Sequence, residues 1–335
     1  MARMASRRSG EVIVDARWAR QVSGIGRFAR EVLKRLPAWS ELRAGEPWRA
    51  SDIVNHQRIS LGPGDLVFSP GYNAGLTRAR QLLTLHDLMH LGSERSPFKL
   101  SYYRSFVRPA IMKAGVALTV SEASARELRG WLCDDRVDVR VVGNGYDARS
   151  IGGDVRRKRP PSRPRLLYVG NLKTHKNFPM ALRVLQRVVD ARLDVVTSDA
   201  SQVVRLTREV GSNLEGRITV HSMIDDSALT DLYRSADVLL IPSRTEGFGL
   251  PALEAQMMGV PVVYWEGCAA LAEVTGGLAH PVPDADDPTA WAQAAVDAIG
   301  ASPSADPRFE AWKAQFSWDK TAARVGQAIE DLMEV

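Results

Sequence analysis

The chain has little cysteine and no long apolar run. Its 335 residues include two cysteines, Cys133 and Cys268, too few for the disulfide framework that stabilises small secreted domains. No segment approaches the roughly 18 consecutive apolar residues that a membrane-spanning helix requires. Arg3, Arg7 and Arg8 near the N-terminus are not followed by an apolar stretch, which argues against a secretory signal. We therefore expect a cytoplasmic protein.

Positive charge is unevenly distributed along the chain. Residues 1–150 hold 24 Lys and Arg against 15 Asp and Glu, whereas the remainder holds 20 against 24, for a net charge of +5. A basic first half predicts an anionic partner, and an anionic phospholipid surface and a lipid diphosphate are two candidates. Nucleic acid is not expected as a partner, because the basic residues are dispersed and are not interleaved with exposed aromatic residues.

Short β-branched runs alternate with amphipathic stretches from one end of the chain to the other. Between the runs, apolar residues recur at three- and four-residue spacing, which predicts helices between strands. This alternation predicts an α/β fold with parallel sheets covered by helices on both faces. The expected strands are 11–15, 65–68, 81–85, 116–120, 137–142, 165–169, 193–197, 217–220, 237–241 and 260–263.

A segment rich in glycine, arginine and proline divides the chain at 151–164. Such a segment cannot pack into a core and is typical of an exposed linker. We expect an N-terminal domain at 1–153 and a C-terminal domain at 160–315. Because ligands of such folds bind at the carboxyl ends of the strands, we expect a cleft between the two domains.

The most informative segment is 237–254, with the sequence DVLLIPSRTEGFGLPALE. It predicts an apolar strand, a polar loop and a helix that begins near Leu250. The loop amides and the helix dipole would favour an anion, whereas Glu246 and Glu254 suit the hydroxyls of a sugar or ribose. In the alternative interpretation, Glu246 caps the helix and Glu254 is a surface residue, although capping normally uses Ser, Thr, Asp or Asn.

This segment closely resembles the donor-site signature of glycosyltransferase family 4, in which seven residues separate two glutamates. Further stretches that are similar to family segments are 15–17, 24–28, 83–88, 120–124, 142–147, 167–177 and 316–318. The resemblance implies the GT-B fold, with two Rossmann-like domains, an interdomain cleft and a final helix at 316–335 that returns to the first domain. It implies that the domain at 1–153 binds the acceptor and the domain at 160–315 binds the nucleotide-sugar donor. It also implies a sugar-nucleotide-dependent transferase that acts with retention of anomeric configuration.

The resemblance implies a role for each matching residue of the donor site. Glu254 would hold the ribose hydroxyls, Glu246 the hydroxyls of the donor sugar, and Lys176 the diphosphate. His86 would contact the sugar at the catalytic centre. The other donor-binding candidates are Gly26, Asn171, Lys173, Met223, Ile224, Gly247, Phe248, Gly249 and Leu250.

A cation near the diphosphate is expected on chemical grounds, because departure of the diphosphate develops negative charge. Many relatives have an arginine at the position of Asn171, and Lys173 could substitute for it. Two alternatives stay open at this point. Lys176 could be a solvated lysine at the start of a helix, and His86 could be a buried histidine with satisfied hydrogen bonds.

We expect no metal ion and no cofactor, since the sugar nucleotide is a substrate. His86 and His90 have ligand-like spacing, but a third ligand is not evident. Asp284 and Asp286 resemble a metal-binding Asp-x-Asp pair. Because a helix is expected to begin at Pro288, helix capping explains these aspartates better.

The stretch 96–113 predicts an aromatic, basic helix. One interpretation is an interfacial helix that meets anionic lipid or a polyprenyl-diphosphate acceptor. In the other, Leu100, Tyr103 and Phe106 pack inward and the basic face is solvated. The candidate acceptor contacts are Asp87, Tyr103 and Arg104.

These features predict a retaining hexosyltransferase. The His-Lys-Asn sequence at 175–177 resembles bacterial mannosyl- and rhamnosyltransferases of surface polysaccharide assembly, which favours GDP-mannose as donor over a dTDP- or UDP-linked sugar. The acceptor would be a glycan or a polyprenyl-diphosphate-linked glycan, and the enzyme would be cytoplasmic or peripheral at the inner face of the plasma membrane. The alternatives are a sugar-nucleotide epimerase, a phosphorylase, or a non-catalytic protein that binds nucleotide sugars or anionic polymers.

Overall fold

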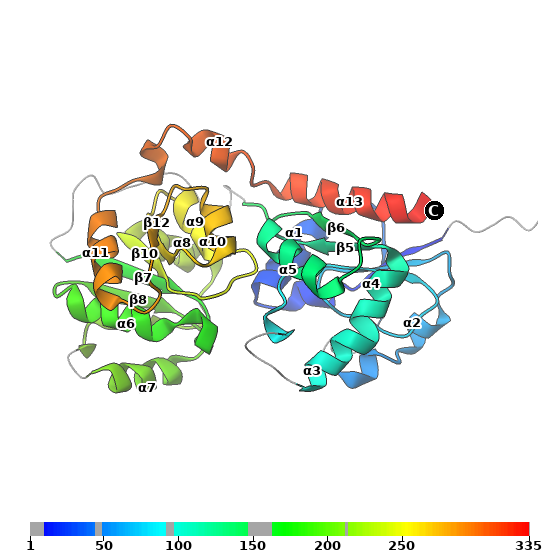
Figure 1. The fold of residues 1–335 in the computed structure, drawn as a ribbon, viewed down its shortest axis with the longest axis horizontal. Helices are drawn as coiled ribbons and strands as arrows, with labels where there is room; N and C mark the ends of the chain where they lie inside the picture. The colour runs from blue at the N-terminus through cyan, green and yellow to red at the C-terminus, as the bar shows by residue number, and fades with distance from the viewer. Residues whose placement is uncertain (1–9, 44–48, 92–96, 147–162, 212–213, 335) are drawn as a thin grey trace, which may run out of the picture. The chain divides into compact units, whose positions relative to one another are not determined.

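The chain forms two compact units (Figure 1). The first comprises residues 1–145 and 317–335, and the second comprises residues 146–316. The predicted linker at 151–164 lies outside the described residues except for its last two positions. The computed structural model describes residues 10–43, 49–91, 97–146, 163–211 and 214–334.

The first unit is built on parallel strands. Its four-stranded sheet has the order β2-β1-β3-β4, and a parallel bridge between Thr84 and Leu118 links the β4 side to the parallel pair β5-β6. The strands are β1 (Val12–Val14), β2 (Ser40–Glu41), β3 (Leu66–Ser69), β4 (Arg80–Leu83), β5 (Val116–Thr119) and β6 (Asp138–Val141).

Helices cover the strands of the first unit, and the last helix of the chain is one of them. Arg35 and Asp319 form an ion pair of 2.6 Å that ties α13 to the segment after α1. The final helix thus returns to the first unit, as expected. The helical elements are η1 (Ala16–Arg20), α1 (Gly24–Leu33), η2 (Ala50–Asp52), α2 (His56–Ser60), η3 (Met89–Leu91), α3 (Pro97–Tyr102), the π-helical turn η4 (Tyr103–Val107), α4 (Arg108–Ala114), α5 (Glu122–Leu132) and α13 (Trp318–Glu334).

A buried ion network lies beside the carboxyl end of β1. Arg17 donates to both oxygens of Asp15 at 2.6 Å and to both oxygens of Asp52 at 2.8 and 3.0 Å. Arg58, which is 0% exposed, lies 3.5 Å from Asp52 and 3.6 Å from Asp15. Burial alone would lower the pKa of Arg17, but its hydrogen bonds to the two aspartates raise it above the ordinary value. The two positive and two negative charges of this buried network therefore compensate one another.

The second unit contains one parallel sheet in the order β12-β11-β10-β7-β8-β9. In chain order this is the 3-2-1-4-5-6 arrangement of a doubly wound sheet, whose direction of winding reverses between β7 and β10. The strands are β7 (Arg165–Val169), β8 (Arg192–Val196), β9 (Ile218–His221), β10 (Val238–Ile241), β11 (Val262–Trp265) and β12 (His280–Val282).

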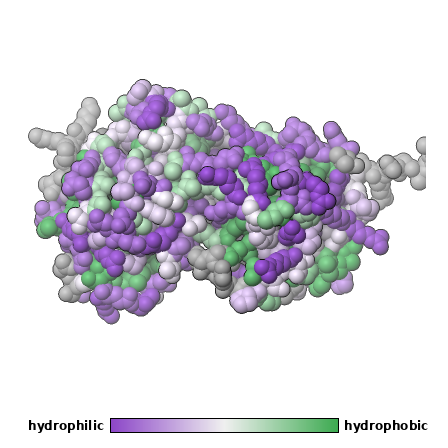
Figure 2. Space-filling view, viewed as in Figure 1, coloured by the Kyte–Doolittle hydropathy of each residue, from purple (hydrophilic) through white to green (hydrophobic). Residues whose placement is uncertain are grey.

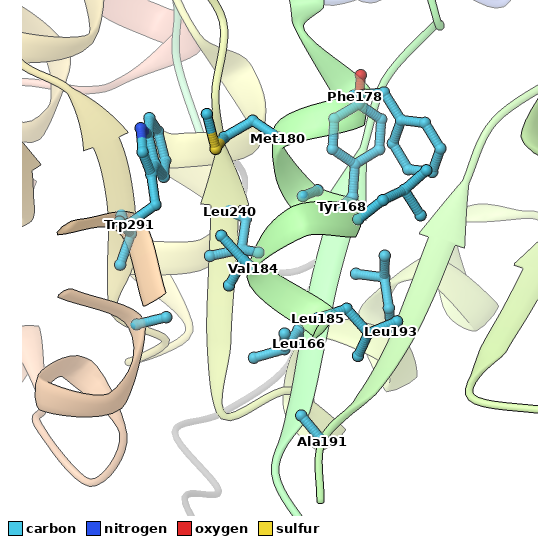
Figure 3. Packing of buried hydrophobic residues seen from close by; sticks show 14 of the residues in the cluster. Leu166, Tyr168, Phe178, Met180, Val184, Leu185, Ala191, Leu193, Leu240 and Trp291 are labelled. Atoms are coloured by element: carbon cyan, nitrogen blue, oxygen red, sulfur yellow. The ribbon is translucent and has the colours of Figure 1, made fainter. Parts of the chain in front are cut away.

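The core of the second unit lies between the sheet and the helices α6 and α11 (Figure 3). Phe178 and Trp291 are 0% exposed and pack on apolar side chains of β7, β8 and β10. The helical elements are η5 (Thr174–Lys176), α6 (Phe178–Arg187), α7 (Ala200–Val210), α8 (Asp226–Ser235), α9 (Leu250–Met257), α10 (Ala269–Thr275), α11 (Pro288–Ala298), η7 (Pro303–Ala305) and α12 (Phe309–Lys313).

Every strand expected from the sequence forms, with small shifts of its ends. Two strands were not predicted, β2 and β12, and each lies at an edge of its sheet. β2 has two residues and β12 contains Pro281, so neither carries the run of β-branched residues that marks a strand. Within the part of the chain that the structure describes, no helix is long and apolar enough to cross a membrane.

Candidate functional site

Two oppositely charged side chains meet after strands β7 and β10. Lys176 Nζ lies 2.7 Å from Oε1 and 2.6 Å from Oε2 of Glu246, and the two side chains are 18% and 11% exposed. Lys176 ends the turn η5 that follows β7, and Glu246 lies in the loop that follows β10. These strands flank the position at which the winding of the sheet reverses, which is where doubly wound sheets bind ligands.

Backbone contacts bring this pair together. The N–H of Arg244 donates to the carbonyl of His175 at 2.7 Å, which joins the loop after β10 to the turn that carries Lys176. Earlier in that turn, the side chain of Asn171 accepts from the N–H of Lys173 at 3.2 Å. Asn171 and Lys173 are both exposed. Of the predicted phosphate contacts in this segment, Lys176 is the one whose side chain bonds to Glu246 at the distances given above.

The helix α9 begins at Leu250, as predicted, and no side chain caps its N-terminus. Its N-cap residue is Gly249, with φ of +98°, and a Cβ at this position would lie 2.6 Å from Leu271 Cδ2. Glycine is therefore favoured there by its positive φ, and a larger residue would also have to displace the end of the Leu271 side chain. The capping role for Glu246 is wrong, because its carboxylate pairs with Lys176. Pro251 has no N–H, and those of Ala252 and Leu253 donate to the carbonyl of Gly249. The N–H of Leu250 and the helix dipole are therefore what the start of α9 can present to an anion.

Glu254 lies inside the second unit. It is 5% exposed, and the hydroxyl of Tyr233 donates to its Oε2 at 2.9 Å. The interpretation of Glu254 as a surface residue is therefore wrong. A buried carboxylate requires hydrogen-bond donors, and Tyr233 on the neighbouring helix α8 supplies one that was not predicted.

The remaining donor candidates of the second unit lie around these groups. Gly247 and Phe248 are buried, and the ring of Phe248 packs edge-on against Phe316 with centroids 6.2 Å apart. In the loop after β9, Met223 has φ of +52° and is 97% exposed, and Ile224 is half-buried.

A thiol and a phenol near the pair were not predicted. Burial raises the pKa of Cys268 to about 12, and the negative charge of Glu246 adds to this effect. Burial, and then Glu246, also raises the pKa of Tyr168. Both groups are therefore protonated at neutral pH. Cys268 follows the end of β11, so its place in the strand order is the signal that could have placed it near the site.

Gly26 and His86, the donor candidates of the first unit, already have hydrogen-bond partners. The N–H of Gly26 donates to Ser23 Oγ at 3.1 Å, and a Cβ at this position would lie 2.0 Å from the carbonyl oxygen of Gln21. His86 Nε2 lies 2.9 Å from the carbonyl oxygen of Pro70. Because a carbonyl only accepts, Nε2 carries the proton, and burial lowers the pKa of the ring. Neutral His86 then offers Nδ1 as an acceptor.

The three acceptor candidates differ in accessibility. Tyr103 is 1% exposed, Asp87 is half-buried, and Arg104 is exposed. Two further residues, Tyr72 and Glu127, lie within electrostatic range of Asp87. Burial and then the charge of Asp87 raise the pKa of each. Asp87 and Glu127 are therefore two carboxylates within electrostatic range of each other.

The aromatic stretch at 96–113 is helical over its described part. Tyr103 and Phe106 pack inward, whereas Phe98 on α3 is 73% exposed and Lys99 lies beside it. Figure 2 shows hydrophobic patches on this unit among a mainly hydrophilic surface, one of them over the region of α2. The inward-packing interpretation holds for the two aromatic residues, and Phe98 leaves an apolar ring at the surface.

The acidic segment before α11 caps that helix. Asp287 accepts from the N–H of Thr289 at 2.8 Å, and Asp286 forms an ion pair with Arg244. The N-cap of α11 is therefore Asp287, whereas Asp284 accepts from the N–H of Asp286 at 2.8 Å, so the capping role expected for Asp284 and Asp286 is wrong. Within the described ranges, no group of three or more His, Cys, Asp or Glu side chains could hold a metal ion.

Comparison with known proteins identifies relatives of this chain. Residues 163–300 match the family model described as glycosyl transferases group 1. D-inositol 3-phosphate glycosyltransferase of Xylanimonas cellulosilytica is 32% identical over 184 residues, which cover 49% of this chain and 41% of that protein. O-antigen chain mannosyltransferase RfbU of Salmonella typhimurium is 25% identical over 276 residues, which cover 80% and 74%. The structure of Anabaena HepE in complex with UDP-glucose gives a TM-score of 0.70 at 13% identity, with 96% and 99% covered.

The match to glycosyl transferases group 1 spans most of the second unit. The fold of the chain is GT-B, which it shares with HepE over nearly the whole length of both chains. The expected fold class is thereby confirmed, and the family resemblance is confirmed at the level of glycosyl transferases group 1. The match spans about two fifths of the D-inositol 3-phosphate glycosyltransferase.

Proposed function

We propose that this chain is a retaining glycosyltransferase that transfers a hexose from a sugar nucleotide to a hydroxyl of a glycan or lipid-linked acceptor. The observation that carries the proposal is the Lys176–Glu246 pair at the reversal point of the second sheet. A cation suits the diphosphate, and a carboxylate suits sugar hydroxyls. The N-terminus of α9 begins a few residues after Glu246 and adds a second positive end for the diphosphate.

The proposed reaction is a front-face displacement. The bond between sugar C1 and the diphosphate oxygen breaks, and the acceptor oxygen bonds to C1 on the same face. The acceptor proton passes to the departing phosphate oxygen. Lys176 would stabilise the charge that develops on the diphosphate, and one such fixed donor contributes roughly 3–4 kcal/mol. Glu246 would position the sugar hydroxyls and Glu254 the ribose hydroxyls.

The same residues explain how the reaction would proceed without a metal ion or cofactor. Lys176 and the N-terminus of α9 supply the positive charge that a divalent cation supplies in other transferases. The turnover rate should therefore be unchanged when EDTA is added to the assay. A rate that falls with EDTA and returns with Mg²⁺ or Mn²⁺ would contradict metal independence.

GDP-mannose is our first candidate for the donor. RfbU, similar over 80% of this chain, is named as a mannosyltransferase, whereas HepE was solved with UDP-glucose. The melting temperature of the chain should therefore be measured with GDP-mannose, UDP-glucose, dTDP-rhamnose and ADP-glucose. We expect GDP-mannose to raise it most. A larger shift with a dTDP- or UDP-sugar would make that sugar nucleotide the donor candidate in place of GDP-mannose. If none of the four raises the melting temperature, the proposed site is contradicted.

Incubation of the donor without acceptor separates the transferase from its alternatives. A transferase slowly releases the free sugar and the nucleoside diphosphate, because water can replace the acceptor. An epimerase returns an intact sugar nucleotide with altered sugar configuration, and a binding protein returns the donor unchanged. We expect release of the nucleoside diphosphate, measured by anion-exchange chromatography.

We propose that the first unit receives the acceptor and meets an anionic membrane surface, which would make the enzyme peripheral at the cytoplasmic face. Asp87 and Arg104 are the accessible acceptor candidates. The exposed ring of Phe98 with the cations Lys99 and Arg104 has the composition of an interfacial contact. The chain should sediment with vesicles of phosphatidylglycerol and phosphatidylcholine at low salt, and Phe98→Ser should sediment less. If the wild-type chain does not sediment with these vesicles, the proposed membrane contact is wrong.

A further inference from the structure

Tyr233 and Glu254 join two helices of the second unit through a buried hydrogen bond. The hydroxyl of Tyr233 donates to Glu254 Oε2 at 2.9 Å and lies 3.5 Å from the carbonyl oxygen of Pro251. Tyr233 is 0% exposed and Glu254 is 5% exposed. Tyr233 belongs to the last turns of α8, and Glu254 and Pro251 belong to α9. A bond between two charged or polar groups at this depth restrains both side chains.

The bond acts on the orientation of the carboxylate. A glutamate side chain has three rotatable bonds, and its two oxygens can accept hydrogen bonds in several directions. A phenol that is held by packing on all sides is a rigid donor. Its hydrogen bond to Oε2 therefore selects one rotamer of Glu254 and one direction for the carboxylate plane. A group that must accept from the two hydroxyls of a ribose benefits from such prior orientation.

We infer that Tyr233 is a positioning residue that orients Glu254 toward the ribose of the nucleotide and thereby sets the preference for ribonucleotides over 2′-deoxyribonucleotides. The inference rests on the proposed function, since it takes the ligand to be a nucleoside diphosphate sugar. Tyr233 acts through Glu254 and does not itself touch the ligand. Its effect should therefore appear only with ligands that carry the 2′-hydroxyl.

The test compares dissociation constants for two pairs of ligands, GDP with 2′-deoxy-GDP and UDP with 2′-deoxy-UDP, measured by calorimetry on the full chain. The preference ratio is the Kd of the deoxy form divided by that of the ribo form. For the wild type we expect a ratio of roughly tenfold or more, because the lost hydrogen bond involves a charged acceptor. Tyr233→Phe should lower this ratio several-fold by weakening the ribo form, and Glu254→Gln should bring it close to one.

The pair should also behave as one unit in a double-mutant cycle. In the Glu254→Gln background, Tyr233→Phe should produce no further change in the ratio, because the oriented carboxylate is already gone. The matched control is Tyr264→Phe. Tyr264 is a buried tyrosine of the same unit whose hydroxyl bonds to Thr275. Its variant should leave the ratio at the wild-type value.

The outcomes separate this inference from the proposed function. If Tyr233→Phe weakens the ribo and deoxy ligands equally, or leaves the ratio unchanged, the positioning role is wrong and the nucleotide site stands. If the wild-type protein binds none of the four diphosphates, the proposed function and the inference both fail. A ratio that falls in Tyr264→Phe as much as in Tyr233→Phe would show a general packing effect and would also overturn the inference.

Discussion

Lys176 and Glu246 are 70 residues apart in the chain, yet Nζ of the lysine lies within hydrogen-bond distance of both oxygens of the glutamate. The two side chains have separate proposed roles. Lys176 would bind the diphosphate, and Glu246 would bind the sugar hydroxyls. In the structure each group neutralises the charge of the other. Binding of the donor would replace this ion pair by contacts from both groups to one ligand.

Replacement of Glu246 should affect the nucleotide and the sugar in opposite directions. Glu246→Gln removes the charge that competes for Lys176, so the Kd for GDP should fall by roughly two- to fivefold, the range expected for a partly exposed ion pair. The extra affinity that the sugar adds in GDP-mannose should decrease, because an amide is a weaker acceptor than a carboxylate. Calorimetry with both ligands measures the two effects.

The control for this substitution is Glu310→Gln. Glu310 forms an exposed pair with Lys313 at 3.8 Å in the same unit, and its loss should change neither Kd. Weaker binding of GDP by Glu246→Gln would mean that the carboxylate supports the diphosphate contact and does not compete with it. The division of tasks between the two residues would then be wrong.

Asp52→Asn should destabilise the first unit substantially. The substitution leaves the buried guanidinium of Arg58 and part of that of Arg17 without compensating charge, and breaking a buried pair in this way costs about 3–5 kcal/mol. Urea unfolding of the full chain measures the loss in free energy of unfolding. Glu41→Gln is the control, because its pair with Arg20 is exposed and should contribute about 0–1 kcal/mol. Equal losses in the two variants would show that the buried network is not essential to stability.

His86 should make the chain less stable in acid. Burial lowers its pKa below the ordinary value of 6.5, with Asp87 acting weakly in the opposite direction. Its contribution is present above the unfolded pKa of about 6.5 and is lost as the pH falls through the lowered pKa, because the unfolded chain binds the proton first. The melting temperature of His86→Gln should therefore fall less between pH 7 and pH 5 than that of the wild type. The exposed His56 provides the control variant, and equal losses in His86→Gln and the wild type would contradict this account.

The strands and the donor segment were predictable because their signals are local. β7 and β10 are short apolar runs that end before polar loops, and α9 begins where Leu250 and a following proline indicate. Nothing local predicts that Lys176 would pair with Glu246. Their meeting depends on the strand order and on the backbone bond from Arg244 to His175, and both are long-range features.

The polar residues that were not predicted were missed for one physical reason, which is that their partners are distant in the sequence. Asp52 and Arg58 lie in a polar stretch that has the composition of a surface, and only the fold brings them to Arg17. Tyr233 stands among the apolar residues of an amphipathic helix, where its ring predicts burial but its hydroxyl gives no indication of a partner. Tyr103 was predicted both as an acceptor contact and as an inward-packing residue, and the π-helical turn places it inward.

The most direct test of the account follows GDP-mannose by proton NMR in the presence of the full chain and no acceptor. We predict that GDP and α-mannose appear together, with the α-anomer formed first, and that Lys176→Ala slows their release roughly 100- to 1,000-fold. Lys313→Ala, which removes an exposed lysine of the same unit, should release them at the wild-type rate. β-Mannose as the first product, or an unchanged rate in Lys176→Ala, would contradict the central claim.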